Sequence, residues 1–224
     1  MRFCAASDQS VLVYLGEEIS LAVHERVEKL LRVLQKNPPA WLRNIQPAYA
    51  SLMVTFDPCR TDHAEVEAAL KKFEARAEKT RPPKARLIEI PVCYGGAFGP
   101  DLEEVARMHN LKKSQVIAHH TAPTYHAYFL GFSPGFAYLG DLPDAIASPR
   151  LESPRKKVPA GSVGIADRQT GVYPSSTPGG WRLIGRTPVI MFRPDRKPMT
   201  TISIGDQVKF HAISEKEFQK WRPA

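Results

Sequence analysis

Three arginines beside turn-forming residues are the strongest candidates for chemistry in this 224-residue sequence. Arg150 and Arg155 close two successive Ser-Pro-Arg triplets, and Arg186 follows Ile184-Gly185. A guanidinium group holds a carboxylate or phosphate through two parallel hydrogen bonds, and bare glycine N–H groups add to such a site. We therefore predict an anion-binding site built from these arginines. Further groups of this site are expected at Gly135, Ser162, Gly179 and Gly180.

An ordinary surface ion pair is the alternative for each arginine taken singly. The prolines of the two triplets stiffen the chain and hold Arg150 and Arg155 at a fixed spacing. Since all three arginines lie beside such turns, the set as a whole favours a binding function. The acidic residues that would serve the alternative are Asp141, Asp144, Glu152 and Asp167.

Histidines are the next candidates, because His119, His120 and His126 fall within eight residues. No acidic residue or cysteine stands at metal-ligand spacing from them, so we predict no metal site. We keep His120 as a candidate general base or hydrogen-bonding group. The remaining histidines are interpreted as surface residues, among them His24, His63, His109 and His211.

Aromatic side chains follow several of the turns. A Pro-Gly pair precedes Phe136, and Pro178-Gly179-Gly180 precedes Trp181. Most aromatic residues of this region must lie in the core of a β domain. Those that directly follow a turn are expected to be exposed and to line a groove for a ligand or partner. The predicted groove residues are Phe136, Tyr138, Tyr173 and Trp181.

Composition limits the class of protein. With 43% hydrophobic residues the chain can bury a core, and it contains no apolar run long enough to span a membrane. The start of the chain lacks the apolar centre of a signal peptide, and the three cysteines are odd in number and far apart. These features predict a cytoplasmic protein without disulfides or zinc. The net charge of +8 is spread out and no nucleic-acid-binding motif accompanies it, so we expect no nucleic-acid partner.

Hydrophobic periodicity predicts two domains of an α+β protein. Residues 1–80 contain strands at 11–15 and 51–56 and helices at 21–34 and after Asp62, which is an expected N-cap with Glu65 as its capping-box partner. This gives a small α/β sandwich with an antiparallel sheet. A charged, proline-rich linker is expected at 81–85.

Residues 86–224 are rich in strands and turns. Gly and Pro punctuate this region regularly, which indicates a barrel or sandwich. Helices are expected after Asp101 and at 114–120. The expected strands are 87–94, 125–132, 161–166, 182–184, 188–192 and 207–213.

Several catalytic motifs are absent. The sequence has no phosphate-binding Gly-x-x-x-x-Gly-Lys-Ser/Thr loop and no dinucleotide fingerprint. Ser133 and Ser162 have no base near them in sequence. The chain is therefore not expected to be a complete nucleotide-driven enzyme.

Long ordered motifs identify a family. They include residues 130–140 (LGFSPGFAYLG), 158–166 (VPAGSVGIA), 178–181 (PGGW) and 205–210 (GDQVKF), with Phe56-Asp57-Pro58 in the N-terminal region. Their order resembles the family of the 5-oxoprolinase B subunit, which is also called allophanate hydrolase subunit 1 or the sporulation-kinase-inhibitor family. The resemblance covers nearly the whole chain.

The resemblance implies a cyclophilin-like β-barrel behind the small α/β domain. It implies a non-autonomous subunit that works with the A and C subunits of 5-oxoprolinase, of the lactam-utilisation type and of a second barrel type, to open 5-oxoproline to glutamate with ATP. Which subunit binds ATP is left open, and no metal or organic cofactor is expected in this chain. Within this picture His120 and Arg155 are the candidate catalytic residues, and replacement of Arg155 by Ala is expected to abolish activity without affecting folding.

Two other functions remain open within the same family. One is a regulator that binds a sensor histidine kinase, and the other is a subunit of urea or allophanate metabolism. The sequence also departs from the usual family pattern, since Asp167 stands where Gly is usual and Thr177 where Ser is common. Residues 199–201 (MTT) replace a more apolar stretch, which is expected to alter a partner-facing surface.

Overall fold

The computed structural model describes residues 1–80 and 84–222, and the chain divides into two compact units, Met1–Lys84 and Ala85–Ala224. The linker that the sequence predicts at 81–85 includes positions 81–83, which lie outside the described residues. Within the described residues, no helix combines the length and apolar character needed to cross a membrane.

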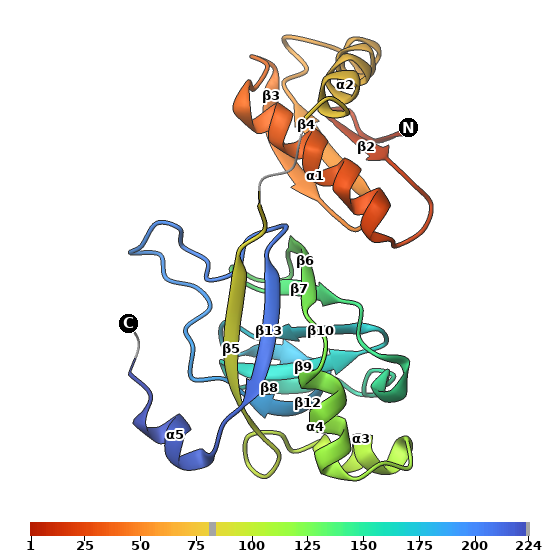
Figure 1. Cartoon of the computed structure of the whole chain (residues 1–224). Coiled ribbons are helices and arrows are strands. Elements are labelled where there is room, and N and C mark those ends of the chain that lie inside the picture. The colour runs from red at the N-terminus through yellow and green to blue at the C-terminus, as the bar shows by residue number, and fades with distance from the viewer. Residues whose placement is uncertain (81–83, 223–224) are drawn as a thin grey trace. The chain divides into compact units, whose positions relative to one another are not determined.

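The N-terminal unit is an antiparallel sheet with two helices, as the sequence predicts (Figure 1). Its strands follow the order β1-β2-β4-β3. Alternate residues of the two central strands are buried with the apolar stripe of α1, for example Val13, Val54 and Leu30. The elements are β1 (Arg2–Ser7), β2 (Ser10–Tyr14), α1 (Leu21–Lys36), β3 (Leu42–Pro47), β4 (Ser51–Phe56) and α2 (His63–Ala77).

Side-chain capping sets where α2 begins. The Asp62 carboxylate accepts a hydrogen bond from the Glu65 N–H at 2.9 Å, which confirms the predicted N-cap. The capping box is not closed as expected, because the Glu65 carboxylate accepts instead from the hydroxyl of Thr61 at 2.9 Å.

The C-terminal unit is a closed barrel of seven strands in the order β10-β7-β6-β13-β5-β12-β9 (Figure 1). The α+β, two-domain architecture with a C-terminal barrel is therefore confirmed. The strands are β5 (Leu87–Tyr94), β6 (Tyr125–Leu130), β7 (Ala137–Gly140), β9 (Ser162–Ala166), β10 (Gln169–Val172), β12 (Arg182–Arg186) and β13 (Gln207–Ala212).

Shorter elements surround the barrel. A two-stranded ribbon pairs β8 with β11, and α3 and α4 cover part of the barrel core. The strand expected at 188–192 is wrong, because within that segment only Phe192 takes part in an isolated bridge, to Thr200. The bounds are α3 (Leu102–Met108), α4 (Lys113–Thr121), η1 (Asp144–Ile146), β8 (Arg155–Val158), β11 (Thr177–Gly179) and α5 (Glu215–Lys220).

Two apolar clusters fill this unit. The larger cluster joins barrel residues such as Val92 and Ile165 to Val105 of α3 and Val116 of α4. The smaller one joins Ala166 and Leu183 of the barrel to Val158 of the ribbon, and it is dominated by aromatic rings. The ribbon was not predicted from the sequence as a separate layer.

Glycine is required where the aromatic rings of the smaller cluster meet the backbone. A Cβ at Gly179 would lie 2.5 Å from the Tyr173 hydroxyl. A Cβ at Gly164 would lie 3.1 Å from the Trp181 Cβ and 3.3 Å from the Tyr173 ring. The turn Pro178-Gly179-Gly180 therefore owes part of its composition to packing over Tyr173.

Candidate functional site

Arg155 projects from β8 into an ion pair. Its Nη2 lies 2.6 Å from Oδ1 of Asp101, whose side chain is only 7% exposed. The other oxygen of Asp101 accepts a hydrogen bond from the Leu183 N–H at 2.6 Å. Arg155 therefore neutralises a buried carboxylate, and the partner is not one of the acids considered from the sequence. The expectation that its removal leaves folding unaffected stays a prediction, and this ion pair argues against it, because Asp101 would lose its counter-charge.

A second ion pair joins β12 to α3, the helix that begins directly after Asp101. Arg182, with a side chain only 9% exposed, lies 2.9 Å from Glu104 of α3 and donates from Nε to the Pro149 carbonyl at 2.9 Å. This arginine was not predicted from the sequence. The available signal was its place directly after Trp181, in the same turn that was singled out for its glycines.

Arg150 is the most accessible of the predicted arginines. Its side chain is 59% exposed, and its nearest acidic partner is Asp167, with Nε and Oδ2 3.9 Å apart. Such a long, exposed pair contributes little to stability. Arg150 is therefore available to bind an anion from solution.

Two tyrosines lie in the electrostatic field of these arginines. Burial raises the pKa of Tyr173, while a hydrogen bond from the Trp181 backbone and the charges of Arg150 and Arg155 act in the opposite direction. Burial also raises the pKa of Tyr138, again opposed by Arg150. We call these four residues, Arg150, Arg155, Tyr138 and Tyr173, the arginine–tyrosine cluster.

The turn Pro178-Gly179-Gly180 borders the arginine–tyrosine cluster. Gly179 pairs with Arg155 across the β8–β11 ribbon, and the Gly180 carbonyl accepts from the Leu151 N–H at 2.8 Å. The segment that carries Arg150 is therefore held directly against the turn. Of the predicted anion-site residues, the structure brings together Arg150, Arg155, Gly179 and Gly180.

Arg186 and Ser162 lie together but in a different setting. They are paired residues on β12 and β9. The Ser162 side chain is fully buried and its hydroxyl has no hydrogen-bond partner among the described residues. The guanidinium carbon of Arg186 lies 5.9 Å from the centre of the Phe98 ring, so this arginine is directed to the loop before α3.

Gly135 lies apart from both groups, in the turn between β6 and β7. It adopts a φ of +86°, and a Cβ there would lie 2.7 Å from that of Phe192. Phe132, which precedes it in the same turn, also has a positive φ of 66° and is 60% exposed. A bulky side chain in this conformation is an outlier that was not predicted from the sequence.

His120 lies inside the barrel core with no exposed surface. The Thr170 hydroxyl donates to the Gly164 carbonyl at 3.0 Å, so it accepts from His120 Nε2 at 2.9 Å. His120 Nδ1 is then the acceptor for the Tyr94 hydroxyl at 2.7 Å. This network fixes a neutral imidazole.

Burial lowers the pKa of His120 to about 3. With both ring nitrogens engaged inside the protein, no substrate proton lies within its reach. The geometry thus assigns His120 a structural part in the barrel rather than that of a general base.

The predicted aromatic groove is mostly closed. The expected exposure is wrong for Phe136 and Tyr173, which are each 2% exposed, and for Trp181, which is 6% exposed. They form the smaller core under the β8–β11 ribbon, and Tyr138 packs at its edge. The four aromatics do lie together, but the exposed ring of this region is Phe132, 5.4 Å from Phe136 centre to centre.

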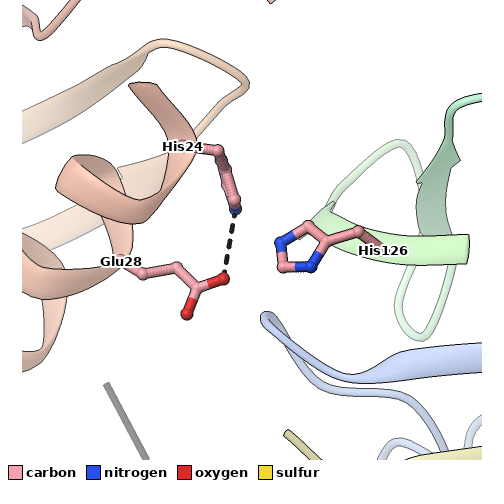
Figure 2. A group of neighbouring side chains, drawn as sticks. All are labelled: His24, Glu28 and His126. Carbon is pink, nitrogen blue, oxygen red and sulfur yellow. Dashed lines mark ion pairs between the residues drawn. The ribbon is translucent and has the colours of Figure 1, made fainter. Parts of the chain in front are cut away.

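One histidine of the N-terminal unit is also more buried than expected. His24 has no exposed surface, and its Nε2 lies 3.6 Å from Oε1 of Glu28, one turn later in α1 (Figure 2). Its Nδ1 lies 3.1 Å from the Tyr49 carbonyl. His126, which is labelled in the same figure, belongs to the C-terminal unit. The interpretation of His24 as a surface residue is therefore wrong.

Comparison with known proteins gives matches along almost the whole chain. The family model for the carboxyltransferase domain, subdomains C and D, matches residues 1–202. The chain is 44% identical to the 5-oxoprolinase B subunit of Bacillus subtilis over 96% of its own length and 94% of that protein. It is 39% identical to the protein of the same name from Escherichia coli O157:H7, over 94% of each.

Solved structures show the same fold. TTHA0988 superimposes with a TM-score of 0.82 and 35% identity, over 93% of this chain, which spans only 40% of that longer protein. PH0987 of Pyrococcus horikoshii is 49% identical over its full length, with a TM-score of 0.59. Urea amidolyase of K. lactis shares the fold at 17% identity and a TM-score of 0.79.

Proposed function

This chain belongs to the family of carboxyltransferase subdomains C and D that includes the 5-oxoprolinase B subunits, and we propose that it is a subunit of an ATP-dependent 5-oxoprolinase. The complex would hydrolyse 5-oxo-L-proline to L-glutamate together with the A and C subunits. The observation that carries this proposal is the 44% identity to the Bacillus subtilis protein over almost the full length of both chains.

The chemistry of the substrate would explain the use of ATP. A five-membered lactam is a resonance-stabilised amide and resists attack by water. Transfer of the terminal phosphoryl group of ATP to its oxygen, with release of ADP, would make the ring carbon electrophilic. Water would then add to this carbon, and cleavage of the C–N bond would open the ring to an acyl phosphate. A second water would hydrolyse the acyl phosphate to glutamate and phosphate. We assign the use of ATP to the complex as a whole.

The substrate also carries a carboxylate, which needs a cationic partner. We assign this part to Arg150, because it is 59% exposed and its nearest acidic group is 3.9 Å away. The paired Arg155 would act as a positioning residue that holds β8 to Asp101. The backbone turn at Gly179 and Gly180 would border the bound carboxylate.

The direct test is reconstitution from three purified subunits. Glutamate release from 5-oxoproline would be measured with ATP for the complete mixture, for this chain alone and for the partners without it. Activity that requires all three supports the proposal. Equal activity without this chain contradicts it.

A function in urea metabolism is a second candidate. Urea amidolyase of Saccharomyces cerevisiae is 21% identical over 96% of this chain, but this chain covers only 13% of that enzyme. The same mixtures supplied with ATP and with urea or allophanate, with release of ADP or ammonia as the readout, would distinguish this candidate. The third sequence-based alternative, an inhibitor of a sensor histidine kinase, has no counterpart among the relatives described above.

A further inference from the structure

The long connection from β12 to β13 forms a hairpin-like lobe beside the barrel (Figure 1). Its two arms are joined by hydrogen bonds from the Arg193 N–H to the Met199 carbonyl at 2.7 Å and from the Thr201 N–H to the Met191 carbonyl at 3.0 Å. Between the arms lies the tip, residues 193–198, with the sequence Arg-Pro-Asp-Arg-Lys-Pro. No part of the anion site described above involves this lobe.

Two hollows meet at the lobe. The first, of about 470 Å³, lies between the lobe, Glu89 of β5 and Trp221 after α5. The second, of about 420 Å³, lies between Phe192 and the loop that contains Phe132. Thr200 lines both hollows, and we call the two hollows together the lobe groove.

Large apolar side chains are concentrated along the lobe groove. Four of the nine exposed ones among the described residues line it: Phe132 (60% exposed), Ile190 (45%), Met199 (47%) and Trp221 (38%). Aromatic and Met side chains are enriched at protein–protein interfaces, and a concentration of exposed apolar groups marks such a surface.

The rim of the first hollow is positively charged. Arg193, Arg196 and Lys197 line it, against the single carboxylate of Glu89. Arg193 is partly neutralised by Asp195 at 3.7 Å, whereas Lys197 has no ion pair or side-chain hydrogen bond within the part of the chain that the structure describes. The groove therefore offers apolar contacts beside an excess of positive charge.

The aromatic end of the groove is held in place before any partner arrives. Hydrogen bonds from the Ser133 N–H to the Gly131 carbonyl at 2.7 Å and from the Phe136 N–H to the Ser133 carbonyl at 3.0 Å close the loop. The Phe132 ring packs edge-on against the buried Phe136. A side chain that is already ordered loses less entropy on binding, which favours affinity.

We propose that the lobe groove docks an acidic segment of a partner subunit, with a large apolar side chain of that segment seated between Met199 and Trp221. Carboxylates of the same segment would pair with Lys197 and the arginines of the tip. The inference rests on the proposed function, in that the partner is another subunit of the oxoprolinase complex. Charge complementarity singles out an acidic segment, because the three cations at the lobe outnumber the carboxylates of Glu89 and Asp195, and a basic or neutral segment would leave Lys197 without an ion-pair partner.

Two variants with matched controls test the surface. Lys197→Glu reverses a charge on the rim, and Lys112→Glu makes the same change at another exposed position. Met199→Ser removes an apolar contact, and Met108→Ser is its control, since Met108 is 44% exposed at the end of α3. Titration calorimetry would measure binding of each full-length variant to the purified A and C subunits separately, at low and at physiological salt.

We expect Lys197→Glu and Met199→Ser to weaken binding to one of these subunits at least tenfold, with the controls within twofold of the parent chain. Binding of the parent chain should weaken as salt rises. Unchanged binding by both lobe variants, in a mixture that still hydrolyses 5-oxoproline, overturns the docking inference and leaves the proposed function standing. Hydrolysis that proceeds equally well without this chain overturns the function itself and the inference with it.

Discussion

Arg155 and Asp101 form an ion pair at 2.6 Å that joins β8 to the residue just before α3, although they are 54 positions apart in sequence. The carboxylate is nearly buried and also accepts from the Leu183 N–H. One acidic residue thus ties the ribbon, the first covering helix and the barrel strand β12 together. Arg155, which the sequence suggests as a ligand-binding residue, therefore stabilises the structure around the site through this ion pair.

Replacement of Arg155 by Ala should destabilise the protein. A buried carboxylate that loses its partner retains its desolvation cost, and because Arg155 is 30% exposed we expect a loss of about 2 kcal/mol in the free energy of unfolding. Urea unfolding checks this. Arg150→Ala is the control, with an expected change within about 0.5 kcal/mol. An equally stable Arg155→Ala protein would contradict the structural part given to this pair.

Arg150 should act on substrate binding rather than on stability. In the reconstituted complex, Arg150→Ala should raise the KM for 5-oxoproline about tenfold or more, because a charge-assisted hydrogen bond to the substrate carboxylate is lost. Arg150→Lys should recover part of the loss. A KM that stays within twofold of the parent value would remove Arg150 from the substrate site.

The neutral His120 should make the fold sensitive to acid. Its pKa is about 3 in the folded protein, below the value of 6.5 for a free histidine, so the unfolded chain takes up a proton first as the pH falls. The neutral imidazole of His120 therefore contributes to the free energy of unfolding in full above pH 6.5, and this contribution is lost as the pH falls from 6.5 to about 3. By pH 4.5 the loss should reach about 2 to 3 kcal/mol.

Substitution isolates this effect. His120→Gln should lower stability at neutral pH, because the network between Tyr94 and Thr170 is broken, and it should flatten the fall between pH 7 and 4.5. The exposed His211→Gln is the control and should follow the parent curve. Parallel pH profiles for His120→Gln and the parent chain would show that His120 titrates normally.

Asp167 offers a stabilising substitution. It occupies the turn between β9 and β10 with a φ of +50°, a left-handed conformation that favours glycine. Asp167→Gly should raise the free energy of unfolding by about 0.5 kcal/mol, since relief of backbone strain is partly offset by the greater entropy of the unfolded glycine chain. Asp167→Ala, which keeps the strain and removes the carboxylate, should not be stabilising, and thermal unfolding of both proteins checks the order.

Local features were the most predictable part of the fold. The N-cap at Asp62, the periodicity of α1 and the turns at Gly135 and Gly179 depend on neighbouring residues, and the sequence therefore reveals them. The partner of Arg155 could not be predicted in this way, because only the closed barrel brings Asp101 to it.

Contacts that only the tertiary structure creates also explain why the predicted exposure of the aromatic residues was wrong. Phe136 and Trp181 follow turns and would be exposed on an open sheet, but the short β8–β11 ribbon covers them. His120 carries a reactive group in a helical segment, and only the tertiary structure places it between Tyr94 and Thr170. Arg150, by contrast, is accessible, with a side chain that is 59% exposed.

The most direct test of the central claim is ATP-dependent glutamate release from 5-oxoproline by the three purified subunits, with and without this chain. We predict turnover only in the complete mixture, with none from this chain alone. We also predict that Arg150→Ala raises the KM for 5-oxoproline in that mixture. Turnover by the two partner subunits at the same rate without this chain would contradict the central claim.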